Sequence, residues 1–549
     1  MKHWWQESVV YQIYPRSFCD SNGDGIGDLR GIIQKLEYLA YLGVDVIWLC
    51  PVYASPNEDN GYDVSDYTAI HPDFGTMEDM DELIDKAREH GIKIIMDIIA
   101  NHTSDQHPWF IEAGKSRDSI YRDYYVFRPD QGGLPSDLQS IFLGPAWDKH
   151  PRLGDYYLHL FAKSQPDLNW HHPEVRENIN GILNFWLDKG IGGFRFDVID
   201  LIAKEIDKGI IADGPKLHEY IQEMNRKSFG QHDVLTVGET WGATVEKAKK
   251  YSNPDGSEFS MIFNFSHILL DSLPGKEKWD YIDLDLLKLK NVFDQQQTQL
   301  YQAGWNSLFW NNHDLPRIVS RWGNDQEYRV QCAKMFGILL HFMQGTPYIY
   351  QGEELGMTNV RFDDFADYRD IETKNMIDQR RKAGYSEESI RNAIWKIGRD
   401  NARTPMQWDA TRNAGFTTGE PWIKLNPNYP QINVASQIDD EESVLQLMRK
   451  LIWYRKESEL KTLIRDGSFN LILTQHPDIF AYQRTYSGEQ LTVICNFHGN
   501  ECSLDLDTTN WVRILGNYSG KDAEIGLHLR PYEAVVFRGE VGQKTGLRD

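Results

Sequence analysis

The sequence predicts an α/β fold: a (β/α)8 TIM barrel with an inserted subdomain after strand 3 and a C-terminal antiparallel β domain. Three observations lead to this prediction. Short apolar runs alternate with amphipathic segments over most of the chain, one connection between them is unusually long, and the pattern changes to closely spaced strands near the C-terminus.

Eight short apolar runs are the candidate barrel strands. Amphipathic segments such as LRGIIQKLEYLAYLG (29–43) and MEDMDELIDKAREHG (77–91) lie between them and end in Gly, a common residue just beyond a helix. The predicted strands cover residues 9–14, 44–49, 92–99, 193–199, 234–238, 261–265, 307–310 and 347–350.

The long connection follows the third strand. Residues 104–172 are rich in Pro, Asp, Tyr and Trp and have little helical period, which indicates an inserted subdomain rather than a loop. The barrel is then expected over residues 1–103 and 173–465. From residue 466 to 549 the runs FNLILTQ, IFAYQRTY, QLTVICNF and EAVVFRG alternate with turn residues and predict a β-sandwich.

Composition excludes several partners. The 549 residues carry a net charge of -23, whereas nucleic acids and anionic membranes require a basic surface. A neutral, hydroxyl-rich ligand is compatible with this charge. Five cysteines without a CxxC pair argue against a disulfide framework or a zinc site. Because there is no signal-like N-terminus and no run of about 18 apolar residues, we expect a soluble, cytoplasmic protein.

The stretch GFRFDVID (193–200) reads as a buried strand, yet it carries Arg195 and Asp197. Residues two apart point to the same face of a strand, so a charged pair shares one face. Buried charges are unfavourable unless they are paired or used. This pair therefore marks a candidate functional site.

Other charged residues fall at the ends of neighbouring predicted strands. Active residues of a (β/α)8 barrel lie at the C-terminal ends of its strands. Each residue alone is compatible with a structural role, such as an aspartate that caps a helix. The combination is much less expected by chance, and it comprises Asp97, Asn101 and His102, then Arg195 and Asp197, then Glu239, and finally Asn312, His313 and Asp314.

Two facing carboxylates suit glycoside cleavage with retention of configuration, in which they lie about 5–5.5 Å apart. The nucleophile must stay ionised, and a neighbouring cation favours this by lowering its pKa. We therefore predict Asp197 as the nucleophile, with Arg195 keeping it charged. Glu239, beside Trp241, is predicted as the acid/base because a less polar setting raises a carboxyl pKa.

These residues resemble the α-amylase superfamily, glycoside hydrolase family 13, over nearly the whole chain. The motifs DIIANH, QPDLN, GFRFDV, GET and NNHD occur in the order of that family. The resemblance implies Asp197 as nucleophile, Glu239 as acid/base and Asp314 as a third acid that holds and distorts the sugar. It also implies a sugar subsite formed by His102, Gln165, Arg195 and His313.

Finer features resemble the oligo-1,6-glucosidase branch. EDNGYDVSDY carries Asp59 and Tyr62, and RDNARTPMQWD carries Arg403. In that branch the matching Asp and Arg hold the distal hydroxyl of the terminal sugar, so that glucose is released from the non-reducing end. Val198, directly after the nucleophile, corresponds to the residue that the branch associates with α-1,6 linkages.

Within the branch, the chain looks most similar to the glucan 1,6-α-glucosidases, also called dextran glucosidases. The loop after the fourth strand is short, and Trp241 and Lys278 match positions that touch the next sugar. Rim packing for Trp241 and a solvated role for Lys278 are the alternatives. The resemblance implies hydrolysis of isomalto-oligosaccharides, dextran and panose, without an organic cofactor, by a protein expected to be a monomer.

A Gly-rich acidic loop, DSNGDGIGD, follows the first strand. Oxygen ligands at alternate positions suit a hard cation such as Ca²⁺. The loop is no EF-hand, because Gly31 stands where the twelfth position would need Glu. The family resemblance implies a structural Ca²⁺ held by Asp20, Asn22, Asp24, the Ile26 carbonyl and Asp28, and Mg²⁺ is the alternative metal.

Several related activities stay open from the sequence. Sugar-isomerising transferases of this family carry an arginine-rich stretch before the seventh strand. Residues 266–293 of this chain contain no arginine, which disfavours that activity. An oligo-1,6-glucosidase or an α-1,4-glucosidase of short substrates uses the same residues. A trehalose-6-phosphate hydrolase needs additional cations for the phosphate. A non-enzymatic, transporter-associated module would lack the catalytic carboxylates, which this chain retains.

Overall fold

The computed structural model of the chain describes residues 3–506, 508, 511–519 and 527–541. It confirms the predicted fold class. Eight parallel strands form one sheet in the order β11-β10-β9-β5-β2-β1-β13-β12, and a parallel bridge between Ile262 and Asn306 joins β11 to β12 and closes the barrel. The strands are β1 (Val10–Ile13), β2 (Val46–Leu49), β5 (Lys93–Ile99), β9 (Gly193–Asp197), β10 (Leu235–Thr240), β11 (Met261–Asn264), β12 (Ser307–Leu308) and β13 (Thr346–Tyr350).

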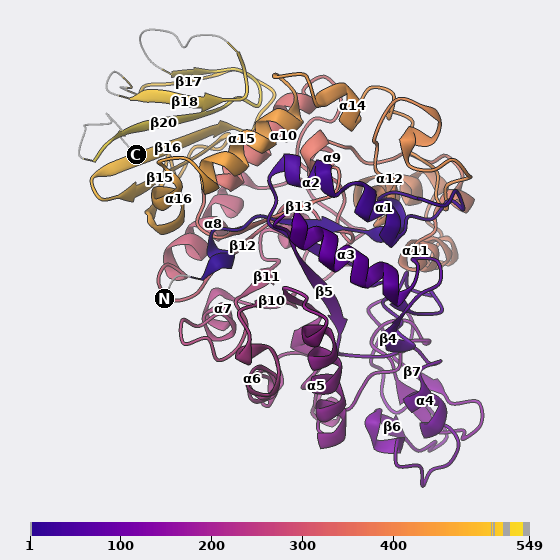
Figure 1. Ribbon diagram of the computed structural model, residues 1–549. Coiled ribbons are helices and arrows are strands. Elements are labelled where there is room, and N and C mark those ends of the chain that lie inside the picture. Colours follow the sequence, from indigo (N-terminus) through magenta and orange to yellow (C-terminus); the bar gives the residue numbers. More distant parts are fainter. Residues whose placement is uncertain (1–2, 507, 509–510, 520–526, 542–549) are drawn as a thin grey trace.

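Helices surround this barrel (Figure 1). Those that connect or flank its strands are α1 (Leu29–Gln34), α2 (Leu36–Leu42), α3 (Met77–Glu89), α5 (Pro173–Asp188), α6 (Leu217–Lys227), α7 (Val245–Tyr251), α8 (Leu286–Gln299), α9 (Ile318–Arg321) and α10 (Arg329–His341). Helix α3 begins with a capping box in which Thr76 and Asp79 exchange hydrogen bonds. The predicted helix over residues 29–43 is divided at Lys35, whose ammonium lies 4.2 Å from the Trp408 ring centroid. Among the described residues, no helix is long and apolar enough to cross a membrane.

The barrel interior is packed rather than hollow, as expected for this fold. Trp48 stacks on Phe263 with ring centroids 5.3 Å apart, within a buried cluster that fills the space between the strands. Gly193 begins β9 with a φ of 139°, and a Cβ atom there would lie 1.8 Å from the Leu235 carbonyl oxygen. Glycine is therefore required where β9 packs against β10.

An inserted subdomain separates β5 from α5. It contains helix α4 (Pro108–Ala113) and a small antiparallel sheet of β6 (Phe127–Arg128), β8 (Tyr156–Leu158) and β7 (Trp147–Lys149). A two-stranded pair, β3 (Tyr53–Ala54) and β4 (Asp66–Ile70), precedes it. The buried ammonium of Lys204 lies 2.7 Å from Asn101 Oδ1 and 2.9 Å from Asp167 Oδ2, so it joins the barrel to the insertion.

The segment after β13 covers one side of the barrel before the chain reaches its last sheet. It contains α11 (Ile371–Lys382), α12 (Glu387–Ile397), α13 (Asp400–Arg403), α14 (Val434–Gln437), α15 (Val444–Lys456) and α16 (Lys461–Asp466). Figure 1 shows α11 and α12 on the side of the barrel where the insertion lies. This segment contributes to the site described below.

The C-terminal region is an antiparallel sheet in the order β14-β15-β16-β20-β18, with the pair β17-β19 beside it. It lies at the opposite end of the molecule from the insertion (Figure 1). Its strands are β14 (Ser468–Ile472), β15 (Ile479–Tyr486), β16 (Glu489–Asn496), β17 (Cys502–Leu504), β18 (Val512–Gly516), β19 (Leu527–Leu529) and β20 (Ala534–Glu540).

Candidate active site

The strand register brings the charged residues together. Asp97 on β5 pairs with Arg195 on β9, and Glu239 follows two residues after Val237, the partner of Arg195 on β10. All lie toward the C-terminal ends of their strands, where a (β/α)8 barrel carries its chemistry. The order of the strands, which no local pattern specifies, therefore creates the cluster.

Arg195 is the centre of this cluster. Its Nη1 lies 2.7 Å from Asp97 Oδ1 and 2.7 Å from Asp197 Oδ1, and its Nη2 forms an ion pair with Glu239. The guanidinium lies 5.1 Å from the Trp48 ring centroid, so the packed barrel core supports it from below. Three buried carboxylates thus share one cation.

This sharing changes the predicted protonation of Asp197. Burial raises its pKa well above the ordinary value for a carboxyl group, and Glu239 and Asp97 act in the same direction, whereas Arg195 acts to lower it. Arg195 thus acts in the predicted direction, but burial and the two neighbouring acids outweigh it. Because one cation cannot balance three ionised acids in a buried site, we expect the substrate-free cluster to retain a proton.

Besides Arg195, two further groups donate hydrogen bonds to Glu239. Trp241 Nε1 donates to Glu239 Oε1 at 2.8 Å, and the Val198 N–H donates to Oε2 at 3.2 Å. Trp241 itself stacks on Phe265 with ring centroids 4.0 Å apart. Trp241 therefore lines the cavity and also positions the predicted acid/base, a role that sequence reasoning did not assign.

Asp314 has a contrasting environment. His313 Nε2 lies 3.0 Å from its Oδ2, while Arg399 and Arg403 lie 3.1 and 2.9 Å from its Oδ1. Burial acts to raise the pKa of Asp314, but His313, Arg399 and Arg403 together hold it well below the usual range. The structure thus drives the pKa values of Asp197 and Asp314 in opposite directions, a pattern typical of carboxylates with different roles.

Arg399, rather than the predicted Arg403, lies beside Asp59 at the cavity. Asp59 Oδ1 lies 3.3 Å from Nη2 of Arg399, not of Arg403. Arg403 lies one layer behind, where its Nε donates to the His313 carbonyl. Both arginines belong to the motif RDNARTPMQWD, and the position opposite Asp59 is taken by the first. They are four positions apart, about one helical turn, and only tertiary packing decides which one reaches the cavity.

Tyr62, His102 and Gln165 form the wall beside Asp59. The Tyr62 ring stacks on His313 with centroids 5.1 Å apart, and its hydroxyl donates to Asp97. Gln165 Nε2 donates to Asp59 Oδ2 at 3.1 Å and lies 3.3 Å from His102 Nε2. Burial lowers the pKa of His102 to about 4, so the imidazole is neutral at pH 7 and can exchange hydrogen bonds with sugar hydroxyls.

A cavity of about 430 Å³ lies over this cluster. Gln165, Arg195, His313 and Arg403 stand behind its surface, each in contact with a residue that lines it. The predicted residues that line it directly are Asp59, Tyr62, His102, Asp197, Val198, Glu239, Trp241, Lys278 and Asp314.

Several lining residues were missed from the sequence. Glu372 forms an ion pair with Lys278, and Arg399 also contacts Asp370, which is fully buried. Phe142 comes from the inserted subdomain. Apart from the first arginine of RDNARTPMQWD, no motif marked these residues, because the segments that carry them show no strand period and reach the cavity only through the fold.

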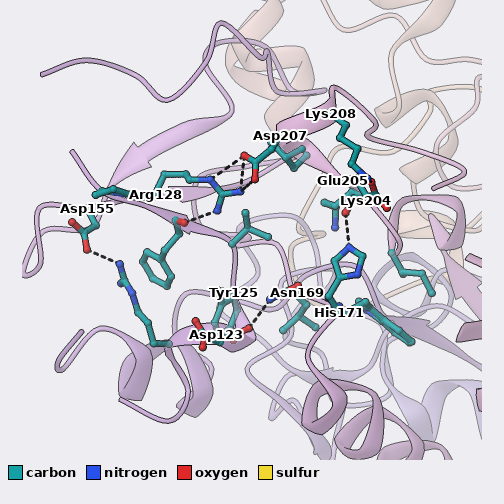
Figure 2. Close-up of a pocket in the computed structure, with 18 of the residues that line it drawn as sticks. Asp123, Tyr125, Arg128, Asp155, Asn169, His171, Lys204, Glu205, Asp207 and Lys208 are labelled. Atoms are coloured by element: carbon teal, nitrogen blue, oxygen red, sulfur yellow. Dashed lines mark hydrogen bonds and ion pairs between the residues drawn. The ribbon is translucent and has the colours of Figure 1, made fainter. Parts of the chain in front are cut away.

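A second cavity, of about 740 Å³, lies between the inserted subdomain and the loop after β9 (Figure 2). Its lining residues in the described part of the chain include none of the predicted catalytic or substrate residues. Its charges largely neutralise one another: Arg128 pairs with Asp207, and Arg122 with Asp155. Because its charges are paired and none of the predicted catalytic residues line it, this second cavity is not the candidate active site.

The acidic loop at residues 20–28 is shaped by its own hydrogen bonds. Asp20 accepts from the N–H groups of Asn22, Gly23 and Gly25, and Asp24 accepts from that of Ile26. Asp28 caps α1 through the Gly31 N–H. Oxygen donors on a tight loop fit a hard cation chemically. Within the described residues, however, no three His, Cys, Asp or Glu side chains converge as metal ligands.

Two family models match the chain. The model described as alpha amylase, catalytic domain, matches residues 12–466, and that of the maltogenic amylase C-terminal domain matches residues 469–536. The first covers the barrel, the insertion and the segment after β13, and the second covers most of the C-terminal sheet.

Individual proteins are similar over almost the full length. The chain is 51% identical to an oligo-1,6-glucosidase of Bacillus cereus, covering 98% of this chain and 99% of that protein. It is 52% identical to a glucan 1,6-alpha-glucosidase of Streptococcus pneumoniae serotype 4, covering 97% and 98%. The crystal structure of a trehalose-6-phosphate hydrolase of Bacillus licheniformis is 44% identical and superposes with a TM-score of 0.92, covering 98% and 100%. With the carboxylate cluster at the barrel's C-terminal end, these matches establish that the chain belongs to the α-amylase family of glycoside hydrolases.

Proposed function

We propose that the protein is a retaining, exo-acting glucan 1,6-α-glucosidase that releases glucose from the non-reducing ends of isomalto-oligosaccharides, dextran and panose. The observation that carries the proposal is the arrangement of Asp197 and Glu239 on one guanidinium, Nη1 and Nη2 of Arg195, at the floor of a cavity. Two carboxylates bound to one guanidinium suit the double displacement of a retaining enzyme, in which a nucleophile and an acid/base face each other across the scissile bond.

The proposed reaction has two steps, formation and hydrolysis of a glycosyl ester. Asp197 attacks the anomeric carbon while Glu239 protonates the glycosidic oxygen, so that the leaving glucan departs and a glycosyl ester forms on Asp197. Glu239, now a carboxylate, then takes a proton from water as the water oxygen attacks the same carbon and releases Asp197. For this step the one proton of the Arg195 cluster must lie on Glu239, so that Asp197 is ionised for attack and Glu239 can protonate the leaving oxygen.

The shape of the cavity supports cleavage from a chain end. Asp59 and Arg399 form a buried ion pair in the wall of the cavity, with side chains 7% and 8% exposed, whereas the Lys278 side chain is 35% exposed and lies nearer the surface. A terminal sugar would meet the ion pair with its distal hydroxyl, and the rest of the glucan would leave past Lys278 and Trp241. A buried ion pair that meets the terminal sugar supports release of single glucose units.

Val198 supports an α-1,6 preference. It lines the cavity directly after the nucleophile and adopts the left-handed conformation, with a φ of 34°. A branched residue rarely adopts this conformation, so its side chain is held in a defined place beside the cleavage point. The relatives with oligo-1,6- and glucan 1,6-glucosidase names point in the same direction.

The charges in the cavity favour a neutral glucan over trehalose 6-phosphate. Each cation that lines the cavity already has a carboxylate partner: Lys278 pairs with Glu372, Arg321 with Asp271, and Arg399 with Asp59. A phosphate would have to compete with these acids for its counter-ions. A sugar hydroxyl can instead bridge the existing pairs.

The test compares kcat/KM for isomaltotriose, maltotriose and trehalose 6-phosphate under identical conditions. We expect isomaltotriose to be the best substrate and the first glucose released to be the α-anomer. Val198→Thr should raise the maltose/isomaltose ratio by about tenfold, since a methyl-sized change shifts discrimination by about 1–3 kcal/mol. Preference for maltotriose or for trehalose 6-phosphate would refute the α-1,6 assignment, and release of β-glucose would refute the retaining mechanism.

We further propose that the loop at residues 20–28 binds a structural Ca²⁺ through Asp20, Asn22, Asp24, the Ile26 carbonyl and Asp28. The support is the oxygen-donor chemistry of the loop and its Asx-type turns. The loop contains none of the residues that line the active cavity. No step of the proposed reaction depends on this ion.

A further inference from the structure

A third hollow, of about 560 Å³, lies outside the active cavity and shares two of its walls. One wall is the segment after the short helix η7 (Ile268–Asp271), and the other is formed by α11, α12 and the turn between them. The same two segments contribute Ser272, Lys278 and Glu372 to the active cavity. Arg380 lies eight residues after Glu372 on α11, about 12 Å along the helix.

The first of these walls folds back on itself. Ser272 pairs with Tyr281 in an antiparallel bridge, and Lys278 precedes the buried Trp279. Ser272 and Lys278 line the active cavity, whereas Leu273, Trp279 and Tyr281 line the outer hollow. Neighbouring residues of one loop thus contribute to the active cavity and to the outer hollow.

The surface of the hollow combines exposed apolar groups. Tyr385 is 46% exposed, and Tyr281 and Leu273 are each 38% exposed. Exposed large side chains are ordinary when they are scattered, but a group of them in one concave surface indicates a binding site. Tyrosine rings offer flat apolar faces suited to the C–H face of a sugar.

Tyr385 is held in place from below. The guanidinium of Arg380 lies 4.8 Å from its ring centroid, and the Tyr385 N–H donates to the Arg380 carbonyl at 3.0 Å. Arg380 is only 5% exposed and donates to Asp280 at 2.8 Å, while its Nε has no hydrogen-bond partner among the described residues. Burial of a cation with an unpartnered donor is unfavourable. The buried Arg380 guanidinium thereby holds the Tyr385 ring in an exposed position.

Hydrogen-bonding groups surround the two rings. Glu388, Ser389 and Asn392 on α12 line the hollow and are exposed. They can contact hydroxyls at the edge of a sugar whose face rests on Tyr385. The combination of flat rings with neutral and acidic acceptors suits a carbohydrate better than an anionic ligand.

We propose that this outer hollow binds the downstream sugars of a glucan whose non-reducing end occupies the active cavity, and that it raises activity on longer chains relative to isomaltose. The inference rests on the proposed function for the identity of the glucan. It assigns Tyr385 as the stacking platform, with Tyr281 and Asn392 as further contacts. The hollow takes no part in bond cleavage.

The experiment measures kcat/KM on isomaltose and on isomaltohexaose for the wild type, Tyr385→Ala and Tyr385→Phe. Tyr385→Ala should lose about fivefold on isomaltohexaose, as expected for one aromatic contact, and should change less than twofold on isomaltose. Tyr385→Phe should retain most activity on both. Tyr486→Ala, which removes a tyrosine of similar exposure (39%) from the C-terminal sheet, is the matched control and should change neither.

Binding gives an independent readout. In the Asp197→Asn background, addition of Tyr385→Ala or Asn392→Ala should weaken binding of isomaltohexaose but not of isomaltose. Equal losses on both sugars, or none on either, would overturn the outer site. If the wild type prefers maltose over isomaltose, the proposed linkage fails, and the same chain-length comparison with maltose and maltohexaose still decides whether the hollow binds sugar.

Discussion

Arg195 defines the site at the scale of single residues. A buried cation next to one carboxylate lowers its pKa, but a cation divided among Asp97, Asp197 and Glu239 cannot do this fully for any of them. We therefore expect the substrate-free cluster to hold one proton, which the leaving group would receive during the reaction. This gives Arg195 a role in proton balance as well as in charge stabilisation.

Asp197→Asn tests the nucleophile. An amide cannot readily form the glycosyl ester, so kcat should fall by about a thousandfold or more. Because burial raises the pKa of Asp197, an uncharged isostere should leave the melting temperature equal or higher. A variant that retains a substantial fraction of wild-type turnover would contradict the assignment.

Glu239→Gln separates acid from nucleophile. It should be nearly inactive on isomaltose but should form the glycosyl ester from α-glucosyl fluoride, whose leaving group needs no protonation. Trp241→Phe, which removes the donor to Glu239 but keeps a ring on Phe265, should shift the pH profile of kcat more than it changes KM. Equal inactivity of Glu239→Gln on both substrates would argue against an acid role.

The buried carboxyl group of Asp200 should make the free energy of unfolding depend on pH. It is 3% exposed, and burial, followed by Asp213 and Glu239, raises its pKa to about 7. Its native pKa therefore lies above that of the unfolded chain, so its stabilising contribution is lost as the pH rises toward 7. Relative to wild type, Asp200→Asn should gain roughly 2–3 kcal/mol more stability at pH 8 than at pH 5.

Melting curves at the two pH values measure this difference. Asp85→Asn, an exposed aspartate on α3, is the control and should show the same small change at both. A gain for Asp200→Asn that does not depend on pH would indicate that Asp200 is ionised throughout or is better solvated than its burial suggests.

At the scale of elements, strand β9 and helix α13 position the charged side chains of the site. Strand β9 needs Gly193 for close packing and then carries Arg195 and Asp197 toward the cavity. The short helix α13 supplies Arg403 from its last position, while Arg399 immediately precedes it. A one-turn difference along this helix separates a residue that lines the cavity from one that supports it.

The acidic loop is the element that tests calcium. If Ca²⁺ binds the folded loop, a chelator should lower the melting temperature by mass action, and added Ca²⁺ should restore it. Asp24→Ala should abolish the response. Asp24 is the sharper choice because Asp28 also caps α1, and loss of a cap alone costs about 1 kcal/mol. An unchanged melting curve in excess chelator would count against the ion.

At the scale of the whole molecule, buried lysines connect the parts. Lys204 joins the barrel to the insertion, and Lys290 on α8 joins it to the C-terminal region. Lys290 is 1% exposed, and its Nζ donates to the carbonyls of Leu473, His476 and Ile479. No apolar side chain can satisfy these acceptors.

Lys290→Met should therefore destabilise the fold by about 2–4 kcal/mol, since it leaves buried carbonyl groups without donors. Lys288→Met, on the same helix but with a side chain 62% exposed, is the matched control and should have little effect. Chemical denaturation gives the free energy of unfolding for both. Equal stability of the two variants would show that water replaces the three bonds.

The sequence by itself determined the barrel, its strands and much of the candidate chemistry. Short continuous apolar runs and capped amphipathic segments are local signals, so the eight strands and the long helices could be predicted from neighbouring residues alone. The motifs around Asp197, Glu239 and Asp314 were visible because each follows its own strand.

Only the tertiary structure decided which residues meet. The pairing of Asp59 with Arg399 rather than Arg403, the ion pair between Lys278 and Glu372, and the three acids on Arg195 all join segments far apart in the chain. The pKa of Asp197 also depends on how deeply the folded barrel buries it and on how many acids share its cation. Burial and charge sharing are properties of packed neighbours, and no local stretch of sequence contains them.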